Sequence, residues 1–335
     1  MKIVQVLLSK RIGGAETLAA SLESEWSTVG VASEIVYLDE DGSSSHPLSR
    51  VRRLVKTLHY LKPDVVVAHS ALPAVYARIC GPIGARVYSV LHSASDDFED
   101  IKLKVAERVL RWRTHGVIAV SAPQAQRYRS RFGGSVPIHV IPNGIPREFR
   151  RPREQATRPA MIIEVARVVA QKRPDVWLTA VAEVLDAYPQ LDAAWWGPPS
   201  GDTGFDEELA ASASRAGLGH VFQGPTSTPA SAYARGDILA HAATREAHSV
   251  GLLEAAAMGL VVVCSTSVAR DLPNDFPAVT FRDEDPGHLA SRLGEVIAEW
   301  EPHSRRAHAY AAEIAATYSA EECARRYLRI LGGAG

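Results

Sequence analysis

The chain has 335 residues and a formal net charge of −1, with 46% hydrophobic and 22% charged residues. This composition is typical of a globular protein and excludes disordered and fibrous chains, and the length allows two domains with a core in each. The first apolar run, Ile3 to Leu8, is too short for the core of a signal peptide, and no run approaches a transmembrane helix. We therefore expect a cytoplasmic protein, peripheral at most at the inner face of a membrane. Three cysteines without metal-type spacing fit a reduced state: Cys80, Cys264 and Cys323.

The charge is distributed unevenly along the chain. Residues 1–150 carry 20 Lys and Arg against 14 Asp and Glu, a net charge of +6, whereas the remainder has a net charge of −7. Two interpretations stay open: ordinary solvated helix faces, or contact with an anionic membrane or acceptor. Nucleic acid is not expected, because the basic segments carry few aromatics and no known binding motif. The excess is concentrated in Arg50, Arg52, Arg53, Lys56, Lys102, Lys104, Arg108, Arg111, Arg113, Arg127, Arg129 and Arg131.

A glycine-containing turn follows the first predicted strand. Residues 2–8 form an apolar strand, and the turn at 11–14 leads into a helix over 15–26. Gly13 and Gly14 allow backbone amides to approach a phosphate, although a plain tight turn is the alternative. The turn is neither a Gly-x-Gly-x-x-Gly nor a Walker A motif, which disfavours nucleotide-cofactor folds of those types.

The first half continues as alternating strands and helices, which predicts a parallel α/β sheet. His92 comes directly after the strand over 86–91. Because α/β sheets bind ligands at the carboxyl ends of their strands, His92 is a candidate site residue. The other predicted strands cover 32–38, 64–68 and 117–121, and the predicted helices cover 48–61, 72–80 and 101–113.

The second half repeats the pattern after a polar linker. Pro142, Asn143 and Gly144 end the last strand of the first half, and residues 146–159 read as the linker. A new strand over 160–165 follows, and then Arg167, Lys172 and a helix over 174–188. Further strands are expected over 193–196, 221–223 and 260–264, and a last helix over 320–331.

The segment from residue 245 to residue 259 carries two carboxylates, Glu246 and Glu254, eight positions apart. Ser249 is a preferred N-cap and Gly259 a preferred C-terminal residue, so we predict a helix from Val250 to Met258.

The start of this helix predicts an anion site, because the free amides near Val250 and Gly251 favour negative charge. Carboxylates accept hydrogen bonds from sugar hydroxyls, so the expected ligand is a phosphate that carries hydroxyl-rich groups.

These motifs together resemble the retaining glycosyltransferases of family GT4. The resemblance lies in Glu246-x7-Glu254, in Arg167-x4-Lys172, in Gly13-Gly14-x-Glu16, in the Pro-Asn-Gly hinge and in the last helix. It implies an α/β fold of the GT-B type, with two Rossmann-like domains facing each other across a cleft. Residues 1–150 would bind the acceptor, with a C-terminal helix of about 320–335 crossing back, and residues 156–319 would bind the nucleotide sugar.

The resemblance also implies roles for individual residues. His92 would contact the transferred sugar, Arg167 and Lys172 would clamp the donor diphosphate, and Glu246 would hold sugar hydroxyls. Glu254 would hold the ribose, and the remaining donor-binding residues would be Gly13, Gly14, Ser249, Val250 and Gly251. The implied reaction moves a sugar from a nucleotide diphosphate donor to an acceptor without a metal or cofactor. The acceptor is not identified: it could be lipid-linked, a glycan or a small molecule.

The sequence departs from the family pattern at three places. Ala166 stands where a glycine usually precedes Arg167, and His241-Ala242 replaces the usual Pro-Ser. Residues 265–271 lack the usual glycine pair. We expect Ala166 to be tolerated. The change to His241-Ala242 puts the local shape of that loop in doubt, and not the carboxylates. The missing glycine pair puts in doubt how the nucleotide ribose and phosphates are bound at residues 265–271.

Three other functions remain open: a sugar-nucleotide epimerase of the same fold, a phosphorylase, and a non-catalytic nucleotide-binding subunit. No lysine-bearing cofactor motif supports a phosphorylase. Asp96 and Asp97 could be a metal pair, but a solvated acidic loop is the preferred interpretation.

Overall fold

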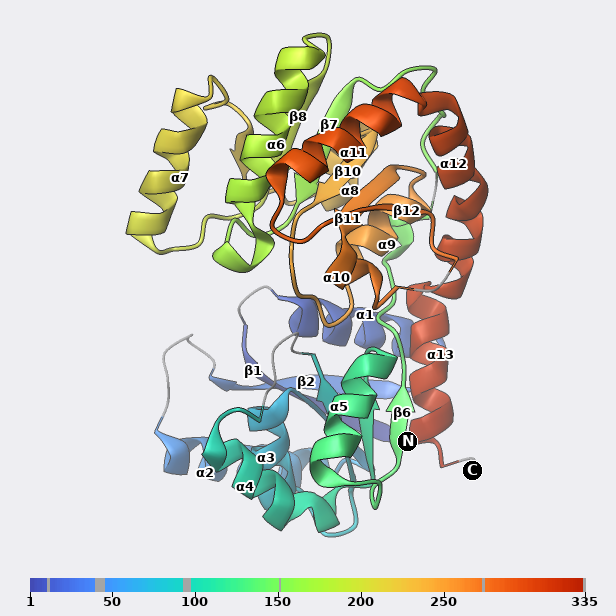
Figure 1. Cartoon of the computed structure of the whole chain (residues 1–335). Helices are drawn as coiled ribbons and strands as arrows, with labels where there is room; N and C mark the ends of the chain where they lie inside the picture. The colour runs from blue at the N-terminus through green and yellow to red at the C-terminus, as the bar shows by residue number, and fades with distance from the viewer. Residues whose placement is uncertain (11–12, 40–45, 93–97, 151, 273–274, 334–335) are drawn as a thin grey trace. The chain divides into compact units, whose positions relative to one another are not determined.

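The computed structural model describes residues 1–10, 13–39, 46–92, 98–150, 152–272 and 275–333. The chain divides into two compact units (Figure 1). Unit 1 comprises Met1–Gly144 and Ala320–Gly335, and unit 2 comprises Ile145–Ser319. The boundary falls within the Pro-Asn-Gly segment and at the start of the last helix.

Unit 1 is built on a parallel six-stranded sheet in the order β2-β1-β3-β4-β5-β6. Its central strands, such as β3 with every residue buried, read as continuous apolar runs because helices cover both faces. The strands are β1 (Lys2–Ser9), β2 (Ala32–Asp39), β3 (Val65–His69), β4 (Arg86–Leu91), β5 (Gly116–Ala119) and β6 (Ile138–Val140). The helices are α1 (Gly14–Thr28), α2 (Pro47–Leu61), α3 (Ala71–Cys80), α4 (Ile101–Leu110), α5 (Ala122–Phe132) and α13 (Ala320–Leu331).

Helix α13 belongs to unit 1 although it ends the chain. Its Tyr327 is fully buried, with its ring centroid 6.2 Å from that of Trp26 in α1. The indole nitrogen of Trp26 donates to the carbonyl oxygen of Ala324 at 3.1 Å. Buried aromatic area therefore joins the last helix to the first.

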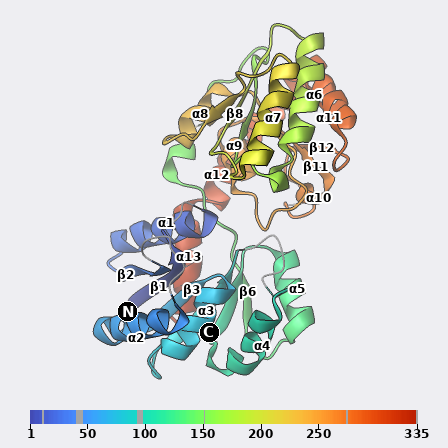
Figure 2. The same ribbon diagram turned by 90° about the vertical axis from the view of Figure 1, so that its left-hand side faces the viewer.

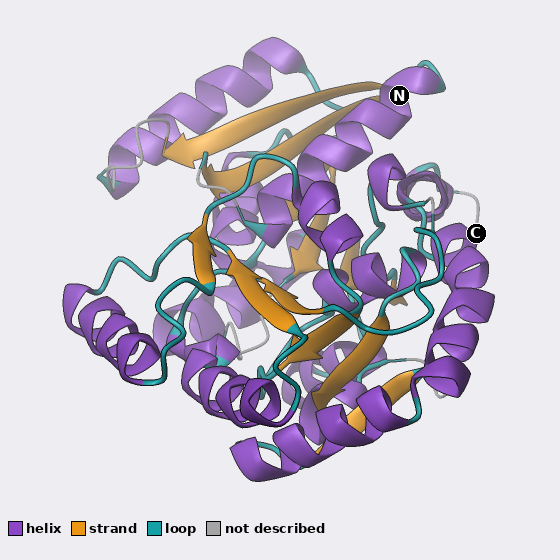
Figure 3. Cartoon of the chain, turned by 90° about the horizontal axis from the view of Figure 1, so that it is seen from above, coloured by secondary structure: helices purple, strands orange, loops and turns teal. Residues whose placement is uncertain are grey.

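Unit 2 holds a second parallel sheet, in the order β12-β11-β10-β7-β8-β9. Helices flank the strands in each unit (Figures 2 and 3). The strands are β7 (Met161–Val165), β8 (Asp192–Trp196), β9 (Phe222–Gly224), β10 (Ile238–His241), β11 (Val261–Ser265) and β12 (Ala278–Phe281). The helices are α6 (Pro174–Ala187), α7 (Thr203–Arg215), α8 (Pro229–Arg235), α9 (Val250–Ala257), α10 (Thr266–Ala269), α11 (Pro286–Ala298) and α12 (Trp300–Thr317).

Each sheet has one point where the strand order reverses. In unit 1 this switch point lies between β1 and β3, and in unit 2 it lies between β7 and β10. Ligands of open α/β sheets bind beyond the carboxyl ends of the strands at such points. The order of the strands therefore indicates which loops form a site.

The predicted α/β fold with two Rossmann-like sheets is confirmed. Some boundaries differ: the helix predicted over 101–113 ends at Leu110 and continues as a 3-10 turn over Arg111–Arg113. Helix α9 ends at Ala257, and Gly259 follows with φ of +81°, a conformation that favours glycine. No helix in the described ranges is both long and apolar enough to cross a bilayer.

Candidate active site

The loops at the switch point of unit 2 carry charged residues that the sequence singled out. Arg167 and Lys172 follow β7, and Glu246 follows β10. Because β7 and β10 pair in parallel, both loops leave the same edge of the sheet. The side-chain amide of Gln171 donates to the carbonyl oxygen of Arg245 at 2.9 Å and so ties the two loops together. The structure thus brings Lys172 and Glu246 into contact.

Four charged side chains, from strands β7 and β10 and from the loops that follow them, form a largely buried series that we call the charge series. Lys172 Nζ donates to Glu246 Oε1, and that oxygen also lies 3.5 Å from His241 Nε2. On the other side of the imidazole, Nδ1 lies 3.0 Å from Glu164 Oε2. Glu164 and His241 are only 2% and 3% exposed. Negative and positive groups alternate, so each buried charge has an opposite neighbour, which offsets the cost of desolvation.

The pKa shifts of Glu246 and His241 in the charge series favour the charged form of each. Burial acts against ionisation of Glu246, but Lys172 and His241 outweigh it and lower the pKa of Glu246 to about 2. Burial also acts against the imidazolium, yet Glu164 and Glu246 raise the pKa of His241 to about 9. At neutral pH, Glu246 is therefore a carboxylate held between two cations, able to accept hydrogen bonds from hydroxyl groups.

Two residues of the charge series, Glu164 and His241, were not predicted as site residues from the sequence. Glu164 lies inside β7, which was predicted only as an apolar strand, and His241 was noted only as a departure from Pro-Ser. The sequence did contain a signal for Glu164, which is the charged residue of the strand Met-Ile-Ile-Glu-Val. A carboxylate buried without a partner is costly, so a charged residue in a buried strand indicates a partner of opposite charge. Its partner could not be inferred, since β10 becomes the neighbour of β7 only in the folded sheet.

The N-terminus of α9 follows Glu246 in the chain. Ser249 occupies the N-cap as predicted, but its side chain makes no capping hydrogen bond. The amide of Leu253 bonds to the carbonyl oxygen of Ser249 at 3.4 Å, so Val250 and Gly251 precede the first bond of the helix. Their amides, at the positive end of the helix dipole, suit a phosphate oxygen.

Tyr233 of α8 contacts both Gly251 and Glu254. A Cβ atom on Gly251 would lie 3.0 Å from Tyr233 Oη, so a larger residue would displace the ring. Burial raises the pKa of Glu254 to about 7, although the hydrogen bond with Tyr233 acts in the opposite direction. Glu254 is therefore partly protonated at neutral pH.

The loop that begins at Ala166 is fixed by the neighbouring strand. The Ala166 amide donates to the carbonyl oxygen of Trp196 at 2.9 Å, and the Trp195 indole donates to the carbonyl oxygen of Ala166 at 2.7 Å. A Cβ on Gly197 would lie 1.8 Å from this same carbonyl oxygen. Gly197 is thus the glycine that allows the two backbone segments to approach closely, and an alanine is accommodated at position 166. The side chain of Arg167 stays exposed.

In unit 1, Gly13 and Gly14 lie at the start of α1, after β1. Gly13 is the N-cap, with extended backbone at φ −158°, and no atom lies within 4 Å of a Cβ placed on Gly14. A Cβ on Gly13 would instead lie 2.8 Å from Glu16 Oε2, so among the described residues the Glu16 side chain stands beside Gly13, whereas the surroundings of Gly14 are open. The two residues before Gly13 lie outside the described part of the chain.

His92, after β4, is oriented by two residues that the sequence analysis did not single out. Gln5 donates through Nε2 to the carbonyl oxygen of Ala19 at 2.9 Å, so its Oε1 is an acceptor. His69 Nε2 lies 3.0 Å from this Oε1 and donates to it, and His69 Nδ1 lies 2.9 Å from His92 Nε2. Burial, and then the neighbouring His92, hold the pKa of His69 well below its ordinary value, so the ring is neutral. Its Nδ1 therefore accepts a hydrogen bond from the Nε2–H group of His92, which leaves Nδ1 of His92 as an acceptor. Burial lowers the pKa of His92 to about 4, so the ring is neutral near pH 7.

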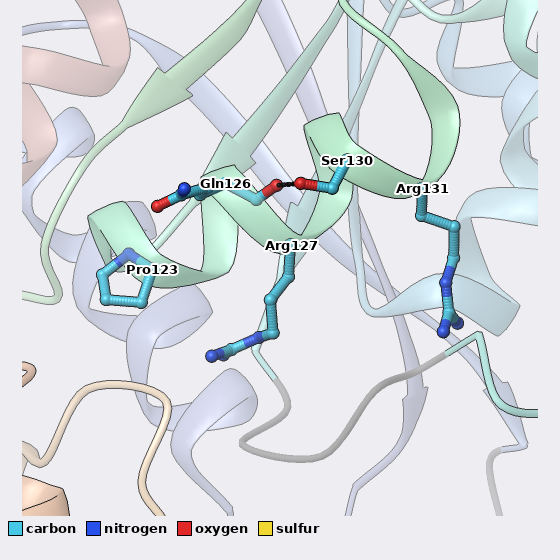
Figure 4. Close-up of a pocket in the computed structure, with 5 residues that line it drawn as sticks. All are labelled: Pro123, Gln126, Arg127, Ser130 and Arg131. Carbon is cyan, nitrogen blue, oxygen red and sulfur yellow. Dashed lines mark hydrogen bonds between the residues drawn. The ribbon is translucent and has the colours of Figure 1, made fainter.

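A shallow depression of unit 1 lies along α5 and has a volume of about 620 Å³. Arg127 and Arg131, one turn apart, point to the same side of the helix (Figure 4). Ser130 on its rim is bonded to the Gln126 carbonyl oxygen at 2.9 Å. This basic depression contains none of the predicted site residues.

In the described ranges, no three metal-ligating side chains come together. Asp96 and Asp97, considered as a metal pair, lie outside the described residues.

Two Rossmann-like units, with charged loops at the switch point of the second, define the GT-B fold class. Residues 12–149 match the family model described as Glycosyltransferase Family 4, and residues 159–299 match that described as Glycosyl transferases group 1. Between them the two matches span most of the chain. The protein belongs to the family 4 glycosyltransferases and is a glycosyltransferase.

Solved structures show the same fold at low sequence identity. Anabaena HepE in complex with UDP and glucose is 18% identical, with a TM-score of 0.82 over 99% of each chain. Sucrose-phosphate synthase from Thermosynechococcus elongatus is 15% identical, with a TM-score of 0.82 over 100% of each chain. The lipopolysaccharide outer core galactosyltransferase WaaB is 15% identical, with a TM-score of 0.69 over 100% of each chain. No curated protein matches the chain significantly in sequence.

Proposed function

We propose that this glycosyltransferase moves a sugar from a nucleoside diphosphate donor to an acceptor with retention of the anomeric configuration. The observation that carries the proposal is the contact between Lys172 and Glu246 at the switch point of unit 2, next in the chain to the uncapped N-terminus of α9. A cation, a carboxylate and free amides form a complementary set for a sugar diphosphate. The Anabaena neighbour, solved with UDP-glucose, supports a donor of this class.

In the proposed reaction, the bond between the anomeric carbon and the diphosphate breaks while the acceptor hydroxyl adds to the same face of the sugar. Negative charge then grows on the leaving diphosphate, where Arg167, Lys172 and the amides of Val250 and Gly251 would stabilise it. The acceptor proton passes to the departing phosphate oxygen. The proposal requires no metal, because these cations and amides supply the positive charge.

The remaining roles follow from the state of each side chain. Glu246 is ionised and held in place, so it would accept hydrogen bonds from hydroxyls of the transferred sugar. Glu254, on α9, would hold the ribose. The neutral imidazole of His92 would accept a hydrogen bond from a sugar hydroxyl through Nδ1, as the resemblance to the family implies.

Variants of the two proposed clamp residues test this function. Loss of one charge-assisted donor costs about 3 kcal/mol in the transition state, so Lys172→Ala and Arg167→Ala should each lower turnover about a hundredfold. Arg305→Ala is a matched control, because Arg305 is a cation of unit 2 whose side chain is 69% exposed and pairs with the exposed Glu301. Thermal unfolding should be similar in the control and in Arg167→Ala. Turnover near the wild-type rate in both clamp variants would refute the proposed clamp.

The donor and the alternatives can be separated with the same protein. A thermal-shift screen over UDP, GDP, ADP and their sugars identifies the donor, because a ligand of the folded state raises stability. Incubation of that donor alone, followed by NMR of the sugar, would reveal an epimerase through a new epimer. Nucleotide binding without hydrolysis or transfer would instead identify a binding subunit. The anomeric configuration of a transferred sugar tests retention.

A further inference from the structure

Exposed apolar side chains are concentrated in unit 1. Within the described ranges, every large hydrophobic side chain that is strongly exposed lies between residues 1 and 140. The same part of the chain carries the positive net charge. A cluster of exposed apolar residues marks an interaction surface more often than a stabilising feature.

The largest group of these residues forms a stripe along α4 and the 3-10 turn that follows it. Ile101, Val105 and Val109 recur every fourth residue, and Trp112 lies one turn further on. Residues at this spacing share one side of a helix. The four are between 51% and 77% exposed, with Trp112 the most exposed. We call this surface the α4 face.

The apolar residues of the α4 face are not needed to attach the helix to the unit. The fully buried residue of α4 is Glu107, whose Oε2 lies 2.5 Å from Arg78 Nη1 of α3. The hydroxyl of Tyr128 in α5 donates to the other carboxylate oxygen of Glu107. These polar bonds, together with Leu103, which packs against the buried cluster of α5, attach the inner side of α4 to the unit. Helix α4 lies next to α3 (Figures 1 and 2). Among the described residues, the outer side of α4 stays exposed.

Cations surround the α4 face. Lys102 and Arg108 are exposed on the same helix, between the apolar positions. The Arg113 guanidinium lies 5.8 Å from the ring centroid of Trp112 and donates to the carbonyl oxygen of Gly81 at 2.7 Å. This bond brings the turn next to the loop that carries Ile83, which is 92% exposed. The exposed cations beside the apolar residues of α4 suit an anionic partner.

We propose that the α4 face docks the protein on an anionic lipid bilayer, with Ile101, Val105, Val109 and Trp112 in the interface and Lys102 and Arg108 at the headgroups. Basic helices with an apolar face bind at the surface of bilayers, and tryptophan favours the headgroup level. Lys102 and Arg108 lie beside the apolar residues on the same helix, so both charges can reach headgroups at the level where the apolar side chains enter the bilayer. The residues all lie in unit 1, so this proposal does not rest on the donor site of unit 2.

Vesicle flotation of the full chain tests the proposal. We expect binding to vesicles of phosphatidylglycerol and phosphatidylcholine in low salt, much weaker binding in 500 mM salt, and none to phosphatidylcholine alone. Each cation near an anionic surface contributes about 1 kcal/mol, so Lys102→Gln with Arg108→Gln should weaken binding about thirtyfold. Val105→Ser with Val109→Ser should weaken it at least tenfold.

Matched controls lie elsewhere in unit 1. Tyr60→Ser removes an 84% exposed apolar residue of α2, and Arg129→Gln removes an exposed cation of α5. Both should bind vesicles as the wild type does. Tryptophan emission should shift to the blue on binding, and Trp112→Phe should abolish most of that shift.

Three results would overturn the proposal. The first is the absence of wild-type binding to anionic vesicles in low salt, and the second is wild-type binding by both α4 variants. The third is a concentration-dependent dimer, seen by light scattering, that Val105→Ser with Val109→Ser abolishes, because it would assign the α4 face to a second copy of the chain. Circular dichroism and thermal unfolding of the same variants should match the wild type, which shows that unit 1 is folded.

Discussion

Replacing Glu164 by glutamine should remove the partner that keeps His241 charged in the interior of unit 2. The two residues are 2% and 3% exposed, and their side chains lie 3.0 Å apart. Without the Glu164 carboxylate, only Glu246 favours the imidazolium, while burial and Lys172 oppose it. The pKa of His241 should then fall from about 9 toward its ordinary value or below it.

The magnitude follows from linkage between protonation and folding. A histidine with an ordinary pKa of 6.5 and a folded-state pKa of about 9 gains roughly 3 kcal/mol from its charged form. Because the pKa is raised in the folded state, this contribution is complete below pH 6.5 and is lost as the pH rises toward 9. Glu164→Gln should lower the free energy of unfolding at pH 7 by about this amount and flatten its dependence on pH in that window.

The assay is urea unfolding between pH 6 and 9.5, followed by tryptophan fluorescence. Trp177, Trp195 and Trp300 are buried in unit 2 and report its transition. His220→Gln is the control, because His220 lies 3.7 Å from Asp192 with both side chains more than 60% exposed. The reasoning fails if wild-type unit 2 is equally stable at pH 6.5 and 9, or if Glu164→Gln follows the wild-type pH dependence.

Two further predictions concern the candidate site. Because the pKa of Glu254 is raised to about 7, its carboxylate fraction grows as the pH rises, and the affinity for the nucleoside diphosphate should increase up to about tenfold from pH 6 to 8. Titration calorimetry on the wild type and on Glu254→Gln checks this, and parallel pH profiles would refute it. Gln5→Leu should leave nucleotide affinity unchanged but lower the transfer rate about tenfold or more, because His69 loses the acceptor that sets the tautomer of His92. Gln5→Glu, which keeps an acceptor, should recover part of the rate in steady-state assays, and equal rates in all three proteins would contradict the role of Gln5.

Much of the unit 2 site could be located from residue order. Ser249 and Gly259 bracket α9, and the helix starts at Val250 as the sequence predicts. The pattern could not show that the Ser249 side chain leaves the helix uncapped, since that depends on a side-chain conformation set by the surrounding loop. Arg167, Lys172 and Glu246 were selected together, yet only Lys172 contacts Glu246 in the structure.

The role of α4 illustrates a different limit. Its basic residues were visible in the sequence, but solvated faces and a docking surface remained equally consistent with them. Only the packing of Glu107 against Arg78 and Tyr128 shows which side of α4 points inward. The opposite side of α4 is exposed, and it includes Val105 and Val109.

The sequence by itself indicated an α/β class and many of the strands and helices, because periodicity and capping residues are local properties of the chain. Its short motifs, by their resemblance to family GT4, also indicated the fold and the family. The tertiary structure decided which charges meet. Glu164 and His241 are far apart in sequence and become neighbours because β10 pairs with β7 in the sheet. Likewise, Gln5 of β1, His69 of β3 and His92, directly after β4, come together because these three strands lie side by side. Such contacts follow from strand order, which the loops and helices of the whole unit set together.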